Sequence, residues 1–579
     1  MSIIKTIRFR WRFISIFAAP VLLLPLGFAI GRKAGWCAFV VIWMAFYWVT
    51  EVIPLAITSL MPLVLFPLLG ILSSQRVASF YLNDIGIILV CAMMLGVAVE
   101  TSNLHKRIAL KSILAVGTSN RRLLLGLMLV TMFLSMWTPN ISTASIMIPI
   151  AMAVVDQIRD SSATECIGIR VQEIGSDQKR LIEDRERAVA VMQEDIAPRT
   201  DDKRTRLLRN TMVLGVSFAT SLGGTGTLIG TGPNAVLMGI FDDLFPGSTE
   251  ITFVTWFLYN APTMLICTFL TWAYMQWNAR EAMRSEVGGS SEEKVREEIA
   301  WRYEKLGKIS FAEISVSALI VTMTVAWFAM KPQIFPGWVD ALPHGELVRP
   351  SALVALMALL LFVIPKDPGN PWQSQALLTW EEAVRGVKWG VMLLLGGGMS
   401  LSEACKQSGL SAMLVNSMKG MDVLPPALTA LLFCFATSLF TEITSNTATS
   451  SIVLPFVCDM AIVLRLHPLY LAMPAVVACS FSFIIPAGTP PNALAYELAK
   501  LSIPDIAKPG FFVNLICVFV EVAMIHVLGF PIFGLSRFPE WAEHYRDTTI
   551  SSTPSQTTMG FFAESRTGAT ANIDNRTFW

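Results

Sequence analysis

Long apolar segments separated by short polar connections run along almost the whole chain. Most of them approach about 20 residues, the length that an α-helix needs to cross a bilayer. We expect membrane spans near residues 13–31, 34–54, 55–72, 84–101, 210–240, 253–277, 310–330, 351–365, 389–405, 469–500 and 510–534. The pattern predicts an all-α polytopic membrane protein with about eleven transmembrane helices.

Two further apolar segments carry polar residues in their middle. Thr441–Pro455 is rich in hydroxyls and charged only at Glu442, and Thr138–Pro149 repeats its Thr, Asn, Thr, Ser, Ile and Pro in the same order. A kinked helix with hydroxyls bonded to the preceding turn could explain one copy. Each copy is followed by one member of a second repeat. This is G-T-G-P-N-A-V from Gly230 in the first half and G-T-P-P-N-A-L from Gly488 in the second. Paired, broken apolar segments favour a transporter binding site between inverted repeats.

The charge distribution constrains the topology. The N-terminus is basic, and the charged loops 156–209 and 279–308 hold many Lys and Arg, so all three should be cytoplasmic. Both loops would lie outside if segment 123–155 crossed the membrane once. We therefore predict that 123–155 and 425–463 are re-entrant hairpins, with polar residues near their tips.

An odd number of crossings places the C-terminus outside the cell. The tail, residues 536–579, is polar and is expected to be extracellular and flexible. Asn575 begins an N-glycosylation sequon that fits this location. The sequon at Asn140 lies inside the first hairpin and should not be modified.

These boundaries divide the chain into nine segments. They are the N-terminal spans, mainly scaffold (1–122), the first hairpin (123–155), a charged loop (156–209), a broken helix with the following span (210–278), a second charged loop (279–308), scaffold spans with an interfacial helix (309–424), the second hairpin (425–463), a broken helix with the last span (464–535) and the tail (536–579).

Composition supports the membrane assignment and argues against an enzyme. Hydrophobic residues make up 54% of the chain and charged residues 15%, which is too apolar for a soluble protein of this size. Nine cysteines and five histidines are dispersed, and no nucleophile with a base is apparent. We expect no enzyme activity, no cofactor and no nucleic-acid partner, only membrane lipid, a small anion and a coupling ion.

Neither motif pair contains Arg or Lys. A bound anion would have to be held by hydroxyls, Asn amides, backbone N–H groups at the starts of broken helices, or cations bound beside it. Unwound carbonyls together with Asn and Ser oxygens suit sodium.

Four motifs resemble those of a known family. They are S-M-W-T-P-N (135–140), S-L-G-G-T-G-T-L-I-G-T-G-P-N (221–234), T-S-N-T-A-T (444–449) and T-P-P-N-A (489–493). The chain resembles the sodium-coupled dicarboxylate, citrate and sulfate transporters, the divalent anion:sodium symporter family, from about residue 48 to 541. The resemblance implies a plasma-membrane homodimer whose protomers each combine a scaffold with a transport domain that moves like an elevator.

The resemblance also implies site residues by position. The implied substrate contacts are Asn140, Thr225, Thr227, Asn446, Thr447, Thr489 and Pro490. The first implied sodium site comprises Asn140 and the backbone near Gly224. The second comprises Thr441, Ser445 and Asn446 with the backbone near Ala487 and Gly488.

The chain departs from the family at the first tip. Pro139 and Ile141 stand where the family has Ser and Thr, so we expect weaker sodium binding there and reduced sodium coupling. Glu442 is interpreted either as a proton carrier or as a charge at the mouth of the second hairpin.

These observations predict a secondary active transporter of di- and tricarboxylates of the succinate and citrate class, with sodium as coupling ion. A sulfate transporter, a sodium-independent carboxylate exchanger and an anion channel are the alternatives.

Overall fold

A computed structural model describes residues 3–29, 32–116, 119–174, 203–280, 289–330, 336–410, 413, 424–486 and 488–549. These residues form helices and connections, and the described part contains no strand beyond one isolated bridge between Pro365 and Ala376. Within the described residues, seven helices are long and apolar enough to cross a membrane, and five shorter apolar helices accompany them. The prediction of an all-α membrane protein is confirmed.

The helices up to the second charged loop are α1 (Ile3–Ala29), α2 (Arg32–Thr50), α3 (Leu55–Thr58), α4 (Met61–Leu68), α5 (Ser74–Ser79), α6 (Asp84–Thr101), α7 (Leu104–Val116), α8 (Asn120–Ser135), α9 (Asn140–Ile174), α11 (Lys203–Thr225), α12 (Gly232–Leu244), α13 (Phe253–Asn278) and α15 (Gly289–Lys305). The later helices are α16 (Phe311–Phe328), η1 (Trp338–Ala341), η2 (Gly345–Leu347), α17 (Pro350–Val363), α18 (Trp380–Gly386), α19 (Trp389–Ser408), α21 (Pro426–Phe440), α22 (Asn446–Val463), α23 (Pro468–Ala478), α24 (Pro490–Leu498), α25 (Ile503–Met524), the π-helical turn η4 (Ile525–Gly529), α26 (Phe530–Phe533) and α27 (Glu540–Thr549).

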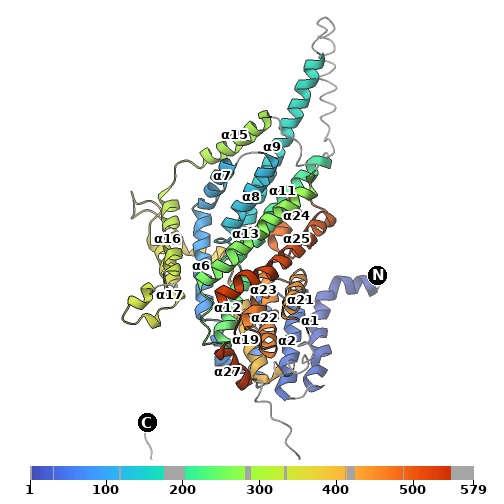
Figure 1. The fold of residues 1–579 in the computed structure, drawn as a ribbon, viewed down its shortest axis with the longest axis vertical. Helices are drawn as coiled ribbons and strands as arrows, with labels where there is room; N and C mark the ends of the chain where they lie inside the picture. The colour runs from blue at the N-terminus through green and yellow to red at the C-terminus, as the bar shows by residue number, and fades with distance from the viewer. Residues whose placement is uncertain are drawn as a thin grey trace, which may run out of the picture.

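The helices around the motifs pack as two related halves. In the first half α11 packs against α8, α9 and α13, and in the second half α23 packs against α21, α22 and α25. Each half also packs one helix against the other half. Helix α12 of the first half packs against α22, and α24 of the second half packs against α9. The sequence repeat is therefore also a repeat of packing relationships, and Figure 1 shows α24 beside α11 and α12 beside α22.

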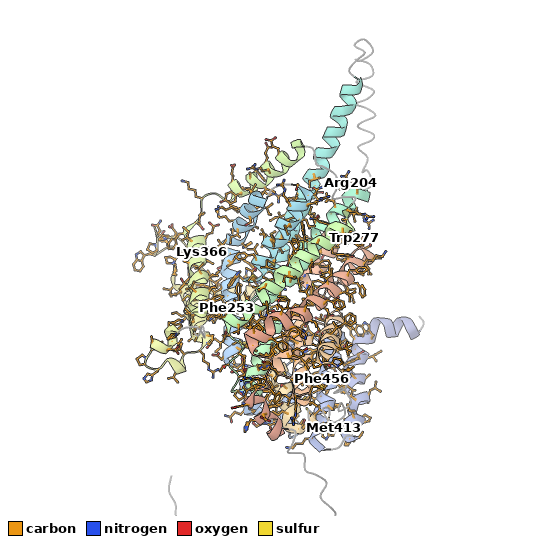
Figure 2. All side chains as sticks on the ribbon, in the orientation of Figure 1. Arg204, Phe253, Trp277, Lys366, Met413 and Phe456 are labelled. Atoms are coloured by element: carbon orange, nitrogen blue, oxygen red, sulfur yellow. The ribbon has the colours of Figure 1, made fainter. Side chains whose placement is uncertain are left out.

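Buried apolar side chains gather in separate cores, and side chains fill the spaces between the helices (Figure 2). The largest core draws mainly on α8, α9, α11–α13 and α21–α25, and Phe218 and Phe483 join the two halves with ring centroids 5.2 Å apart. A second core lies between α6, α16, α17 and α18, and a third between α2, α4 and α19. The helices that carry the motifs thus share a core that the flanking helices mostly do not.

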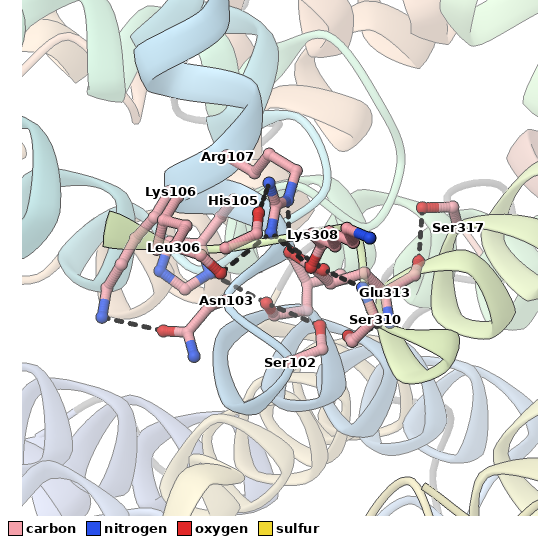
Figure 3. Close-up of polar contacts among 12 residues, drawn as sticks. Ser102, Asn103, His105, Lys106, Arg107, Leu306, Lys308, Ser310, Glu313 and Ser317 are labelled. Atoms are coloured by element: carbon pink, nitrogen blue, oxygen red, sulfur yellow. Dashed lines mark hydrogen bonds and ion pairs between the residues drawn. The ribbon is translucent and has the colours of Figure 1, made fainter. Parts of the chain in front are cut away.

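A buried ion pair ties α7 to the start of α16 (Figure 3). Arg107 donates from Nε to Glu313 Oε1 at 2.7 Å and from a terminal nitrogen to Glu313 Oε2 at 3.2 Å. The same guanidinium donates to the carbonyls of Leu306, Gly307 and Lys308. It therefore holds the connection between α15 and α16 against α7.

The helices of the charged segments and the last helix lie at opposite ends of the molecule. The long α9 projects at one end, where α15 also lies, whereas α27 lies at the opposite end (Figure 1). The predicted loop 156–209 is wrong at its end, because α11 begins at Lys203, and also in its first part, because α9 continues to Ile174. That stretch contains no proline to end a helix.

The predicted flexible tail is wrong in its first part as well. Residues 540–549 form α27, whose Tyr545 is buried and donates to Asp459 at 3.1 Å. The Trp541 ring lies 4.8 Å from that of Phe245, so aromatic packing fixes this helix to the main core. Asn575 lies outside the described residues.

The predicted hairpin segments each consist of two helices joined by a short turn, α8 with α9 and α21 with α22. The broken spans are two helices each, α11 with α12 and α23 with α24. The last span, expected near 510–534, begins earlier, since α25 begins at Ile503 and runs through Pro509. Membrane helices tolerate such a proline where neighbouring groups compensate for the missing bond.

Candidate functional site

The first tip is the turn 136–139 between α8 and α9, and Asn140 is the first residue of α9. The Ser135 hydroxyl lies 2.8 Å from Asn140 Oδ1 and 2.8 Å from the Thr220 carbonyl oxygen in α11. This hydroxyl therefore fixes the Asn140 side chain and connects the hairpin to the broken helix of its own half.

The second tip repeats this arrangement. It is the turn 441–445 between α21 and α22, and Asn446 is the first residue of α22. The Thr441 hydroxyl lies 3.0 Å from Asn446 Oδ1 and 2.7 Å from the Cys479 carbonyl oxygen, just after α23. In both halves a hydroxyl five residues before the Asn orients the amide, so that its NH2 group remains a donor for another partner.

The unwound segments of the two broken helices are held by a second pair of Asn residues. Asn234 Nδ2 donates to the carbonyls of Gly224 at 3.1 Å and Thr227 at 2.7 Å. Asn492 Nδ2 donates to the Ser482 carbonyl at 3.0 Å. Each Asn thus reaches back ten residues to the same place in its segment and satisfies a carbonyl that the helix break has left free.

Glu442 holds the second unwound segment from the tip. Its carboxylate accepts the backbone N–H groups of Phe483 at 2.7 Å, Ile484 at 3.0 Å and Ile485 at 3.0 Å, and the Ser482 hydroxyl at 3.2 Å. The side chain is 5% exposed. The interpretation as a charge at the mouth of the hairpin is wrong, because the structure places Glu442 in the turn at the tip.

The first half uses a different connection at the same place. Met136 stands four residues before Asn140, as Glu442 stands four before Asn446. The Met136 carbonyl accepts the Thr227 hydroxyl at 2.6 Å. One neutral hydrogen bond therefore joins the first tip to its unwound segment, whereas a carboxylate with four donors joins the second.

The structure brings the tips and the unwound segments together. A Cβ placed on Gly224 would lie 2.8 Å from Asn140 Oδ1, and one on Gly232 would overlap the Thr447 hydroxyl. Gly488 lies in the same way against Glu442 and Ser482. Only glycine permits approaches this close.

The predicted substrate contacts differ in the burial and hydrogen bonding of their side chains. Asn140, Asn446 and Thr447 are half-buried and can reach a ligand. Thr225 and Thr227 are buried, and their hydroxyls donate to backbone carbonyls at 2.7 Å and 2.6 Å. We infer that these two threonines shape the backbone of the first unwound segment.

The remaining predicted contacts lie at the start of α24. Thr489 is buried and precedes the helix, whereas Pro490 is its exposed first residue. Ala487 lies outside the described residues. Ser445, predicted as a sodium ligand, accepts the Ala448 N–H at 3.2 Å and so caps α22.

The first tip does not regain the missing oxygens from its neighbours. Pro139 has no hydroxyl with which to cap α9. The Thr143 hydroxyl lies 2.7 Å from that of Thr138, and Ser142 lies beside Glu100 and His105. Neither hydroxyl takes the place that Ser445 occupies at the second tip.

Sequence reasoning missed Ser135, Asn234 and Asn492 as members of the site. A signal existed, since Ser135 precedes Asn140 by the interval that separates Thr441 from Asn446. Both other Asn residues occupy the same position in the repeated G-T-x-P-N motif. Their repetition could have marked them as structural partners of the tips.

The chain is similar in sequence to known membrane proteins. The family described as "Sodium:sulfate symporter transmembrane region" matches residues 8–535. The chain is 36% identical to "Solute carrier family 13 member 2" of Homo sapiens over 94% of this chain and 96% of that protein. It is 35% identical to the "Na(+)/citrate cotransporter" of Rattus norvegicus over 92% and 96%.

A third relative is the "Na(+)/dicarboxylate cotransporter 3" of Mus musculus, 32% identical over 94% of this chain and 96% of that protein. Among solved structures, the YdaH transporter of Alcanivorax borkumensis aligns with a TM-score of 0.43 and 14% identity over 80% of this chain and 90% of that one. A similarity this low carries no argument about the site.

Proposed function

The chain belongs to the sodium:sulfate symporter family, and from this premise we propose that it is a secondary active transporter of di- and tricarboxylates coupled to sodium. Relatives at 32–35% identity are named for cotransport of sodium with dicarboxylates or citrate, and the similarity extends over more than nine-tenths of the chain. Succinate and citrate are the expected substrate class.

The observation that carries this proposal is the meeting of the two tips with the two unwound segments. Asn140 lies against Gly224 within the first half, whereas Thr447 of the second half lies against Gly232 of the first. Residues far apart in sequence thus surround one place between the inverted repeats, which is where secondary transporters bind their substrates.

The chemistry of this place suits a carboxylate anion. Asn140 and Asn446 each begin a helix, so the free N–H groups and the positive dipole ends of α9 and α22 lie beside the two amides. The amide NH2 groups and the Thr447 hydroxyl add neutral donors. Two tips of this kind can receive the two carboxylates of a substrate such as succinate.

Bound sodium ions would neutralise the negative charge that remains on the bound carboxylates. The second tip supplies oxygens from Thr441, Ser445 and Asn446, together with carbonyls of the unwound segment near Gly488. The first tip supplies Asn140 and the Gly224 carbonyl, but Pro139 removes a hydroxyl. We infer that the second site binds sodium more tightly than the first.

The proposal also includes movement of a transport domain and assembly of the protein into a homodimer. The helices that carry the motifs share one core, and α6, α16, α17 and α18 form another, which supports a transport domain moving against a scaffold. Family resemblance implies a homodimer in the plasma membrane. A cytoplasmic second charged loop and a C-terminus outside fit the opposite positions of α15 and α27 (Figure 1).

Uptake measurements test the proposal. The full-length protein is expressed in cells, and accumulation of labelled succinate, citrate and sulfate is followed with and without a sodium gradient. We expect accumulation of succinate or citrate above equilibrium when sodium is present. Accumulation of sulfate alone, gradient-independent exchange, or equilibration without accumulation would replace the proposal with a sulfate transporter, an exchanger or a channel.

A further inference from the structure

A cavity of about 410 Å³ lies away from the tips, between the helices of the two proposed domains. One wall comes from α6 and from the facing ends of α16 and α17, with Ile88 and Trp327 among its residues. The other wall comes from the first unwound segment, α12 and the start of α13, with Met238 and Ile251. This volume is within the range of small-molecule sites.

The cavity is distinct from the proposed substrate site. Leu228 and Ile229 line it, and they follow Thr227, whose hydroxyl points to Met136 at the first tip. The cavity therefore lies on the far face of the first unwound segment. Its lining contains neither tip Asn, and most of it is aliphatic or aromatic.

Arg349 gives the cavity one charged end. It is the only charged side chain among the described residues that line the cavity. Its ion pair with Asp242 is 3.6 Å long, and the two side chains are 61% and 56% exposed. Such an exposed pair contributes little stability, so Arg349 can exchange Asp242 for the carboxylate of a ligand.

Polar groups of the lining other than Arg349 already form hydrogen bonds within the protein. The Thr252 hydroxyl accepts the Thr255 N–H at 3.1 Å and caps α13. The Thr249 N–H donates to Glu250 at 2.8 Å. An occupant must therefore be apolar along most of its length, with an anionic group at the Arg349 end.

We propose that this cavity binds an amphipathic anion, a carboxylate with a medium-length acyl chain, and that its occupancy restrains the two domains relative to each other. The domains touch at the cavity lining, where the ring centroids of Phe253 and Trp327 lie 4.9 Å apart. A ligand that contacts both walls binds only the arrangement in which they face each other, and it stabilises that arrangement. The restraint rests on the proposed transport function; the binding does not.

Binding is tested first, on the purified full-length protein. A dodecanoate that carries a diazirine on its chain is photolysed with the protein, and the labelled peptides are mapped. We expect labelling of peptides around Ile88, Met238 or Ile251, competed by dodecanoate and not by dodecanol. Arg349→Gln should weaken competition by about tenfold, the effect of one lost charge-assisted hydrogen bond.

Arg385→Gln is the matched control, because Arg385 is an exposed arginine in α18 that does not line the cavity. It should leave competition unchanged. Ile251→Trp fills the cavity from a half-buried position in the connection before α13 and should abolish labelling at these peptides. Equal competition by dodecanol, or labelling that survives Ile251→Trp, would overturn the site.

Transport is tested second. Dodecanoate should lower the maximal rate of succinate uptake severalfold without changing the apparent affinity for succinate, and Arg349→Gln should relieve this inhibition. Purely competitive inhibition, or binding without inhibition, would overturn the restraint. Site-specific labelling of a protein that transports no carboxylate would leave the binding site standing and would contradict the proposed function instead.

Discussion

The Ser217 hydroxyl donates to Asn492 Oδ1 at 2.7 Å and so joins α11 of the first half to α24 of the second. The same amide donates from Nδ2 to the Ser482 carbonyl, so both ends of the Asn492 side chain are used. In the first half Asn234 Oδ1 is buried without a hydrogen-bond partner among the described residues. The two halves therefore repeat one arrangement, but among the described residues only its second copy uses the Asn side-chain oxygen to bond the other half.

We expect Ser217→Ala to lower the stability of the protein by about 1–3 kcal/mol, because it leaves a buried amide oxygen without its donor. Thermal unfolding of the purified protein measures this effect. Ser221→Ala is the matched control: Ser221 is buried in the same helix, and its hydroxyl has no partner among the described residues. Equal destabilisation by the two substitutions would show that the bond to Asn492 contributes nothing.

Glu442 should be required for transport as an acceptor for backbone donors. Glu442→Gln replaces one carboxylate oxygen with an NH2 group, which cannot accept hydrogen bonds. The variant therefore loses either the acceptor Oε1 for the N–H groups of Phe483 and Ile484 or the acceptor Oε2 for the N–H group of Ile485. We expect at least a tenfold loss of succinate uptake at normal surface expression. Glu497→Gln, at an exposed position of α24, should behave as wild type.

The proton-carrier interpretation of Glu442 makes a different prediction for the same variant. A proton carrier replaced by Gln would retain transport but lose its dependence on external pH. Uptake measured between pH 5.5 and 8 therefore separates the interpretations. Retained, pH-independent uptake by Glu442→Gln would contradict a role in holding the unwound segment.

Asn446→Ala should abolish uptake while leaving surface expression near normal. The substitution removes the amide that the Thr441 hydroxyl holds in place and that is proposed to serve both substrate and sodium. Asn103→Ala, in the connection between α6 and α7, is the control for loss of an Asn outside the site. Unchanged uptake kinetics in Asn446→Ala would show that the second tip is not the binding site.

The repeated motifs allowed the sequence to predict the location of the tips but not the bonds that position them. Asn140 and Asn446 were found because their neighbours repeat within short segments. The Ser217–Asn492 bond joins residues 275 positions apart, and no local pattern pairs them. Similarly, α27 depends on the packing of Tyr545 and Trp541 against distant helices, so its local polarity was misleading.

The buried pair Arg107–Glu313 should contribute to stability mainly through the cost of breaking it (Figure 3). Glu313→Ala leaves a guanidinium that is 8% exposed without its carboxylate, and we expect destabilisation of about 3–5 kcal/mol. The double variant Arg107→Met with Glu313→Met should be less destabilised than Glu313→Ala, because no buried charge remains.

Thermal unfolding of these variants, with Arg121→Ala at an exposed position of α8 as control, measures the difference. If the double variant unfolds at the same temperature as Glu313→Ala, the unpaired charge is not the cause. The carbonyls of Leu306, Gly307 and Lys308 would then be the important partners of Arg107.

The last prediction concerns sodium coupling, where the two tips differ most. Moving one charge across 100 mV is worth about 2.3 kcal/mol, so a dianion entering a cell that is negative inside is opposed by roughly twice that amount. Two sodium ions cancel this electrical cost, and a third makes uptake electrogenic. The number of working sodium sites therefore decides whether substrate entry carries current.

We expect the wild-type protein to show low apparent sodium affinity and little inward current, because Pro139 and Ile141 remove side-chain oxygens on both sides of Asn140. The double substitution Pro139→Ser with Ile141→Thr restores the groups that Ser445 and Thr447 provide at the second tip. It should steepen the dependence of succinate uptake on sodium and increase the current per substrate. Ser445→Ala in the restored protein is the matched control, since it removes the corresponding hydroxyl from the other tip and should reverse part of the gain. Uptake and current recorded together across a range of sodium concentrations measure both quantities. Steep, high-affinity sodium activation with inward current in the wild-type protein would mean that backbone carbonyls near Gly224 suffice for the first site without those hydroxyls.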